Sequence, residues 1–557
     1  MPREELIFEV PGPGTWTLDN GHIPVPMTKF VAGYFDAVVG EGMAGSFADW
    51  GDFIQLKRAT VNGFSYQQVT FVGVPPGSPD TPSIDHPDVR ERVERTFAVH
   101  HNKLWRVKTR QWFEEVKPKS LETNLSLASV DVEGLDYEVL IRHIETCRDN
   151  VISMFLSHMN FNGTGILPAG LLIDLVSNTT DLSAEEALSL LDGASPISSG
   201  RSPEVQALAL AINADIAAST VIASDTDAAE IIDQLRAMSG EVGVAMNRYL
   251  LIDGHRIATG FDVTSKMMLD LPDVMLGVIK NAVESDESDQ SLEADILARF
   301  VRTKVPSDKQ NEFDELLSDA RDGTPIKDER GLYQDAWALG ILRKALLEAG
   351  ERLLTQGRVH SVEHFMEAGW AEMQAIWLGD DIPTADELET RRTNRMSLTW
   401  RDAPSILGPP PTPPAPIDGL PKEVLKWNAA AQAYSRVRRG TPPGDDAPDL
   451  VGLTANKGIY EGIARVAMGD YDFRNIDTGD VLVTSSQSEG FNAIARRVGA
   501  IVTDTGGPLA HLSIIARELG IPCIAGCKNA TALIPDGARI RVDADSGTVV
   551  LLDYPGY

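Results

Sequence analysis

The C-terminal part of the chain is organised around the run Thr503-Asp504-Thr505-Gly506-Gly507-Pro508-Leu509-Ala510-His511-Leu512-Ser513-Ile514-Ile515-Ala516-Arg517-Glu518-Leu519-Gly520-Ile521-Pro522. An apolar strand is expected just before it, at 500–502, and two adjacent glycines then allow the backbone to turn sharply. Apolar residues follow at helical spacing, at Leu512, Ile515 and Leu519. His511 is therefore expected at the N-terminal end of a helix that Gly520 ends. Strand, turn and helix in this order predict an α/β domain.

His511 is the residue of this run with the most informative chemistry. At the start of a helix, backbone N–H groups and the positive end of the helix dipole favour an anion such as phosphate. The residues expected to cradle that phosphate are Gly506, Gly507, Leu512 and Ser513. A single histidine is more often a packed or surface residue, but Ser, Thr, Asp or Asn would serve better as a plain helix cap. The pattern thus favours a histidine that carries a phosphoryl group.

Length, charge and cysteine content limit the class of protein. A chain of 557 residues can form about three domains. Its net charge of -31 argues against nucleic acid or an anionic membrane as a partner. The cysteines are Cys147, Cys523 and Cys527, too few for a disulfide framework. With no signal peptide and no run of about 18 apolar residues, we expect a cytoplasmic protein.

Proline-rich sequence divides the chain. The region 1–402 is expected to contain strands to about residue 125, including a hairpin at Asn62-Gly63, and then mainly helices. Ser183, as part of a capping box, and Ser202 with a following proline mark helix starts within it. A linker with one short helix is expected over 403–448, and short strands and helices over 449–557. The linker favours a domain that swings, although a static spacer is an equal alternative.

The run around His511 closely resembles the phosphohistidine swivelling domain of the phosphoenolpyruvate synthase and pyruvate phosphate dikinase family. That family has the pattern T-x-G-G-x-x-S-H-x-A-I-x-A-R-E-x-G-I-P-x-V-x-G. The glycines, the histidine and the Ala-Arg-Glu triplet match, and the similarity continues through 529–543 and back to 479–483. Two positions depart, because Ala510 stands for the family's Ser and Ser513 for its Ala. The resemblance implies that Arg517 helps to neutralise the phosphohistidine, and Glu518 is expected to hold this arginine or the local helix.

The resemblance also implies where the phosphoryl group comes from and goes. The chain has no G-x-x-x-x-G-K-[ST] motif and no region like the family's ATP-grasp domain, so ATP and Mg²⁺ are expected on a separate ATP-grasp subunit of a hetero-oligomer. No catalytic barrel follows the histidine domain, which disfavours pyruvate as the acceptor. The domain order is similar to rifampin phosphotransferase without its ATP-binding part. It looks still more like the phosphohistidine subunit of phenylphosphate synthase and related aryl phosphate synthases, whose acceptors are phenols such as phenol or cresol.

The region before the linker is therefore expected to bind the acceptor. His255 and Arg256 could supply a base and a cation, or could equally form a helix-end ion pair. Trp105, Arg110 and Trp112 could line an aromatic anionic site, although an amphipathic helix face is the simpler interpretation. Arg343 is a further candidate for substrate binding. His360 and His364 have no third ligand at a recognisable spacing, so no metal site is expected.

These observations predict a multidomain α+β protein. It has a large α-rich acceptor domain with a β-containing N-terminal part, and a C-terminal α/β swivelling phosphohistidine domain. The predicted activity is ATP-dependent transfer of a phosphoryl group through His511 to a phenolic hydroxyl. Two alternatives remain, an antibiotic phosphotransferase of the rifampin type and a non-catalytic phosphocarrier or regulatory protein.

Overall fold

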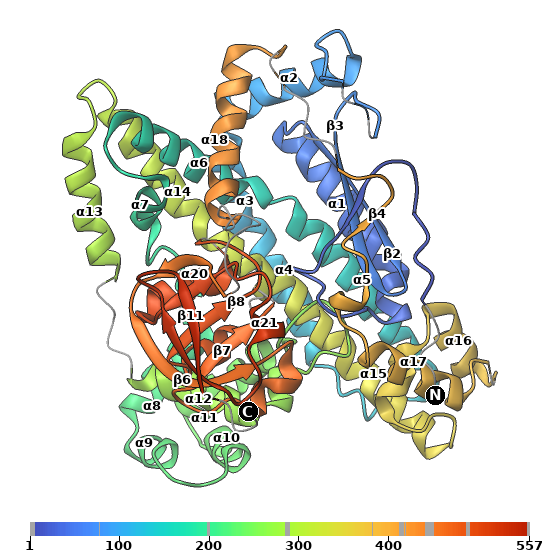
Figure 1. The fold of residues 1–557 in the computed structure, drawn as a ribbon. Helices are drawn as coiled ribbons and strands as arrows, with labels where there is room; N and C mark the ends of the chain where they lie inside the picture. The colour runs from blue at the N-terminus through green and yellow to red at the C-terminus, as the bar shows by residue number, and fades with distance from the viewer. Residues whose placement is uncertain are drawn as a thin grey trace. The chain divides into compact units, whose positions relative to one another are not determined.

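The computed structural model describes residues 6–76, 78, 80–197, 201–284, 290–380, 382–411, 417, 419–439, 450–485, 491–508 and 510–553 (Figure 1). The chain forms two compact units that interleave along the sequence. The first unit comprises 1–164, 261–264 and 333–429, and the second comprises 165–260, 265–332 and 430–557. The arrangement is the multidomain α+β fold that the sequence predicts.

The first unit contains a four-stranded antiparallel sheet in the order β2-β3-β1-β4. Its strands are β1 Trp16–Leu18, β2 Ile54–Val61, β3 Phe64–Phe71 and β4 Ile406–Leu407. The predicted hairpin is confirmed: Asn62 and Gly63 join β2 to β3 with φ of 53° and 82°. Both residues lie in the left-handed region that a two-residue turn between twisted strands requires.

Helices make up most of the first unit, and they begin well before residue 125. They are α1 Lys29–Trp50, α2 Pro87–His101, α3 Leu104–Gln111, the π-helix η1 Trp112–Val116, α4 Lys117–Ala128, α5 Tyr137–Met159, α15 Trp337–Thr355, the 3-10 helix η6 Val362–Glu367, α16 Trp370–Leu378, α17 Ala385–Met396 and the 3-10 helix η7 Trp400–Asp402. Helix α1 contacts β2 and α5. The Thr28 hydroxyl caps it by accepting from the Val31 N–H. Three elements continue into the second unit, namely α6 Asn162–Thr179, the π-helix η5 Gly331–Ala336 and α18 Lys422–Arg439.

The segment expected to be a linker contributes to the first unit. Strand β4 pairs with β1, opposing Leu407 to Trp16, and Leu407 is buried in the same small core as Phe64 and Tyr66. Burial of Leu407 ties this part of the segment to the sheet, which proline content does not reveal. The predicted short helix is present as α18. Residues 412–416, 418 and 440–448 of the expected linker lie outside the described residues, and the domain boundaries at 402 and 448 stay predictions.

The second unit begins with a helical region. It contains α7 Ala184–Leu188, the 3-10 helix η2 Ser189–Leu191, α8 Pro203–Ala214, α9 Ile216–Ile222, α10 Ala228–Ala237, α11 Glu241–Tyr249, the π-helix η3 Leu250–Gly254, the 3-10 helix η4 Met268–Asp270, α12 Pro272–Glu284, α13 Gln290–Lys304 and α14 Gln310–Arg330. The capping box at Ser183 and the cap at Ser202 are both confirmed. Among the described residues no single helix is long and apolar enough to span a membrane. Helices α8 and α9 meet these two criteria only when taken together, and the pair is bent by 113°.

The C-terminal part of the second unit is a seven-stranded sheet in the order β11-β10-β6-β7-β8-β9-β5. Its elements are β5 Leu453–Asn456, β6 Ile459–Val466, the 3-10 helix η8 Asp470–Asn475, β7 Val481–Thr484, α19 Asn492–Ala495, β8 Ala500–Thr503, α20 His511–Leu519, β9 Cys523–Ala525, α21 Ala530–Leu533, β10 Arg539–Asp543 and β11 Thr548–Asp553. Strands β6 to β9 are parallel, and β5, β10 and β11 pair antiparallel. The predicted strand at 500–502 is confirmed as part of β8, and the apolar runs at 481–483 and 523–525 form β7 and β9.

Alternation along the central strands gives this sheet two apolar faces. On one face Leu482, Ile501 and Cys523 belong to a core that also contains helices α8 to α12 of the same unit. On the other face Val481, Val483 and Val502 form a separate core with α21 and strands β10 and β11. Asp470 reinforces the first face, because its buried carboxylate accepts bonds from the Thr259 hydroxyl at 2.9 Å and the Lys266 N–H at 2.8 Å.

Candidate phosphohistidine site

The segment between β8 and α20 places His511 as the first residue of a helix, as the sequence predicts. Gly506 has φ of 92°, a conformation that glycine adopts without strain. Ala510 is the N-cap, with φ of -64° and ψ of 153°, and its methyl group makes no capping hydrogen bond. Gly520 ends α20 in the left-handed conformation. Leu509 and the side chains of His511 and Glu518 lie outside the described residues.

Asp504 braces the loop that leads to His511. Its carboxylate accepts from the Thr531 N–H at 2.8 Å and from the Thr531 hydroxyl. Its own N–H donates to the Thr484 carbonyl, and its carbonyl accepts from the Lys528 N–H. These bonds tie the loop to the ends of β7 and β9, and they use the carboxylate for structure. The sequence pattern assigns no role to Asp504. The feature that could have indicated its structural role is an acidic residue directly after an apolar strand.

A second glycine makes close packing of this loop possible. Gly526 follows β9 and has φ of 72°. A Cβ atom added there would lie 3.0 Å from the carbonyl oxygen of Gly506. Two glycines from different segments therefore let two backbone stretches approach beside the start of α20.

Arg517 reaches back from the second turn of α20 toward the loop. Its guanidinium Nη1 donates to the carbonyl of Pro508, three residues before His511. Asp192, in the helical region of the same unit, has its pKa raised by burial and lowered in part by the charge of Arg517. A cation thus stands near the start of α20, where a phosphoryl group on His511 would carry negative charge.

Leu512 and Ser513 point into the core and could contribute only backbone groups to a phosphate cradle. Both side chains are fully buried. The Ser513 hydroxyl lies against Cys523, whose pKa burial raises to about 12. Burial likewise raises the pKa of Cys527 to about 12, so both groups are thiols near neutral pH and offer no thiolate nucleophile.

His255 and Arg256 are placed as the alternative interpretation expects, in a helix-end ion pair with a capping histidine. Buried His255 donates from Nδ1 to the Leu250 carbonyl at 2.9 Å. Arg256 pairs with Asp253 at 2.9 Å, and the Ser202 hydroxyl also donates to Asp253. Burial raises the pKa of Asp253 to about 6, against the opposing effect of Arg256. Their assignment to the acceptor reaction stays a prediction.

The other candidate acceptor residues belong to the first unit. Trp105 and Trp112 are buried and Arg110 is exposed, which fits an amphipathic helix better than an aromatic anionic site. Arg343 is buried, where it donates to the Val263 carbonyl at 2.9 Å and to Glu363 at 2.7 Å. The structure therefore brings the loop and Arg517 together around the start of α20. The assignment of Trp105, Arg110, Trp112 and Arg343 to the acceptor site stays a prediction.

Two family models match the chain. Residues 476–547 match the model described as PEP-utilising enzyme, mobile domain. Residues 157–328 match the rifampicin phosphotransferase fourth domain. The chain thus has one region similar to the mobile domain of phosphoenolpyruvate-utilising enzymes, with His511 inside it, and one region similar to a rifampicin phosphotransferase domain.

Curated relatives agree with both matches. The uncharacterized phosphotransferase YvkC of Bacillus subtilis is 26% identical over 314 residues, which are 55% of this chain and 36% of YvkC. Rifampicin phosphotransferase of Bacillus cereus is 25% identical over 338 residues, 58% of this chain and 36% of that protein. The probable phosphoenolpyruvate synthase of Archaeoglobus fulgidus is 38% identical over 100 residues, 18% of this chain and 13% of the relative. The chain spans about a third of the length of the first two relatives.

Proposed function

We propose that this chain is a phosphotransferase subunit that carries a phosphoryl group on His511. The group would come from ATP bound with Mg²⁺ to a separate ATP-grasp subunit and would pass to a phenolic hydroxyl, giving an aryl phosphate. The observation that carries the proposal is the position of His511, as the first residue of α20 behind a glycine turn and inside the mobile-domain match.

The site has the electrostatics that a phosphohistidine requires. The positive end of the α20 dipole and the Arg517 guanidinium both favour negative charge at this point. Phosphoryl transfer depends mainly on positioning and on charge stabilisation, so a braced loop with a nearby cation is a suitable carrier. Asp504 uses its carboxylate to hold Thr531, and the proposal places Mg²⁺ with ATP on the partner subunit.

The proposed reaction has two steps that regenerate the histidine. In the first step a phosphorus–nitrogen bond forms at His511 while a phosphorus–oxygen bond of the nucleotide breaks. In the second step the phosphorus–nitrogen bond breaks, the phenolic oxygen bonds to phosphorus, and the hydroxyl proton passes to a base. Because one face of the C-terminal sheet shares a core with α8 to α12, a swing of this domain must replace that apolar contact with another of similar area.

The experiment that tests the carrier is phosphorylation of the full chain. The chain is mixed with an ATP-grasp protein encoded nearby, and ATP labelled at the β- or the γ-phosphate is added in separate reactions. Acid-labile label on the wild-type chain and none on His511→Ala is expected. Equal label on both, or none on the wild type, would contradict the proposal.

The acceptor is tested by exchange. Labelled phenol or cresol should enter the corresponding aryl phosphate on the wild-type subunit without ATP, because the second step is reversible. His511→Ala should show no exchange. Absence of exchange with simple phenols, together with normal labelling of His511, would leave the carrier intact and remove the phenolic acceptor.

A second candidate acceptor has its own support. Residues 157–328 match the rifampicin phosphotransferase fourth domain, and the Bacillus cereus rifampicin phosphotransferase aligns over 58% of this chain. In that case the labelled chain would transfer its phosphoryl group to a bulky antibiotic hydroxyl and not to phenol. Incubating the isolated phosphorylated chain with either acceptor separates the two candidates.

A further inference from the structure

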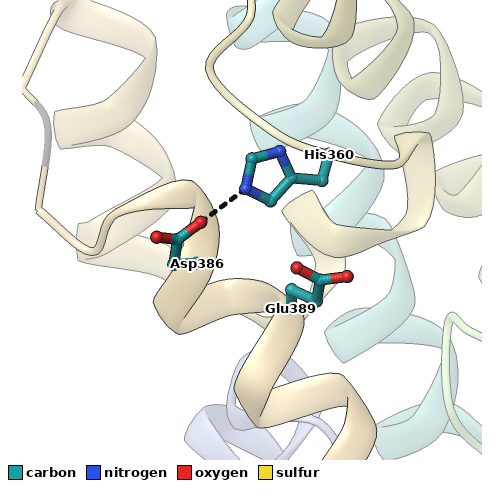
Figure 2. A group of neighbouring side chains, drawn as sticks. All are labelled: His360, Asp386 and Glu389. Carbon is teal, nitrogen blue, oxygen red and sulfur yellow. Dashed lines mark hydrogen bonds and ion pairs between the residues drawn. The ribbon is translucent and has the colours of Figure 1, made fainter.

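A group of three possible metal ligands lies on the surface of the first unit. Figure 2 shows His360, from the segment before η6, facing Asp386 in the first turn of α17, with Glu389 about one turn farther along that helix. One ligand atom from each side chain lies within 4.8 Å of the other two. All three residues are exposed.

The fold brings this group together from positions far apart in the chain. Asp386 and Glu389 are three residues apart on α17 and so share a face of the helix. His360 precedes η6, and its Nε2 lies 2.6 Å from Asp386 Oδ1. His364, the histidine that the sequence pairs with His360, is buried within η6. The two histidines therefore do not mark one exposed helix face.

Neighbouring charges leave the two carboxylates without an arginine. Arg391 bonds to Glu372 at 2.7 Å, and Arg392 pairs with Glu363. Glu387, which lies between Asp386 and Glu389 in the sequence, forms the capping box at the start of α17. Within the described residues, no ion pair or hydrogen bond engages the Glu389 side chain, and His360 is the only charged partner of Asp386.

We propose that His360, Asp386 and Glu389 bind a divalent ion of the Zn²⁺ class. In tetrahedral coordination two ligand atoms at about 2.1 Å from zinc lie roughly 3.4 Å apart. Small side-chain rotations close the present group to that spacing, and the ion replaces the hydrogen that joins His360 to Asp386. Three protein ligands leave one position for water. The bound ion links the segment before η6 to α17.

The ligand set selects among metals. An imidazole with two carboxylates suits Zn²⁺ and its first-row neighbours, whereas Mg²⁺ prefers oxygen ligands and retains its water. The ion is thus different in kind from the Mg²⁺ assigned to the ATP-binding partner. The proposal stands independently of the proposed function.

The test titrates Zn²⁺ into the full chain against a coloured chelator, in a weakly alkaline buffer with excess Mg²⁺. We expect one tight equivalent for the wild type, and His360→Ala, Asp386→Asn and Glu389→Gln should each weaken it by roughly tenfold or more. His101→Ala, which removes an exposed histidine on α2, is the matched control and should bind like the wild type. Circular dichroism establishes that each variant is folded.

A second measurement uses stability. Because the ion binds the folded state, Zn²⁺ should raise the unfolding temperature of the wild type and of His101→Ala, but not that of His360→Ala. Three results would overturn the proposal: no tight equivalent in the wild type, unchanged binding in all three ligand variants, or a loss confined to His360→Ala.

Discussion

The loop before α20 and the charged groups around Arg343 differ in how far apart in the sequence their contacting residues lie. The loop is held by a left-handed turn at Gly506, by Arg517, which bonds to Pro508 nine residues away, and by Asp504, which bonds to Thr531 27 residues away. Around Arg343 the contacts range more widely: Glu363 lies 20 residues away and Val263 lies 80 residues away. Nearby Arg395 bonds to Glu367, 28 residues away, and to the carbonyl of Pro26, 369 residues away. A local motif can be recognised in sequence, whereas a dispersed network cannot.

The largest expected effect tests whether Arg343 is structural. Replacing it in Arg343→Met leaves the Val263 carbonyl without its donor and half-buried Glu363 with Arg392 as its remaining cation, so the free energy of unfolding should fall by about 3 kcal/mol. Urea unfolding of the full chain measures this fall. Exposed Arg142→Met is the control and should change little. Unchanged stability with lost aryl transfer would instead make Arg343 a substrate residue.

Asp253 should make the second unit more stable as the pH falls. Its pKa is raised to about 6 in the folded state from 3.8, so its favourable contribution is complete below pH 3.8 and is lost as the pH rises through 6. In Asp253→Asn the stability difference between pH 5 and pH 7.5 should shrink by about 1.4 kcal/mol, because one pH unit of linked titration lies in that window. Unfolding midpoints of both proteins at the two pH values measure it, and parallel pH profiles would contradict the assignment.

Arg517 should affect the chemistry more than the fold. Arg517→Gln removes the cation beside the start of α20 and should slow phosphorylation of His511 by about tenfold or more, with a loss of stability of about 1 kcal/mol. Arg517→Lys keeps the charge but loses the planar guanidinium, and an intermediate rate is expected. Equal rates of labelling in all three proteins would show that Arg517 serves only to hold Pro508.

The smallest expected effect comes from Ala510, where this chain departs from the family pattern. Ala510→Ser supplies a hydroxyl that can cap α20, so the free energy of unfolding should rise by about 1 kcal/mol. Ala510→Cys is the control of similar size with a poor capping group. Differential scanning calorimetry measures the stability of each variant. The rate at which labelled phosphate enters the chain shows whether the hydroxyl also speeds phosphorylation of His511. Identical behaviour of the two variants would mean that the cap is unimportant.

The sequence alone determined the parts of the fold that short-range rules control. Asn62-Gly63 predicts its hairpin because few residues accept the left-handed backbone there, and the spacing from Gly506 to Gly520 predicts where α20 begins and ends. The apolar run at 500–502 predicts a strand, whereas the parallel pairing at the centre of the C-terminal sheet is known only from the structure. The fold of the first unit is harder to predict from sequence, because its early helices and the pairing of β4 with β1 depend on which surfaces are buried together.

Only the tertiary structure decided which polar residues meet. Arg343 and Trp112 look like binding residues in sequence, yet folding buries them. His360 has no metal ligand at a local spacing, and the approach of α17 places two carboxylates beside it. The physical reason is the same in each case. Backbone conformation depends on neighbouring residues, whereas burial and charge pairing depend on which distant segments the whole chain brings together.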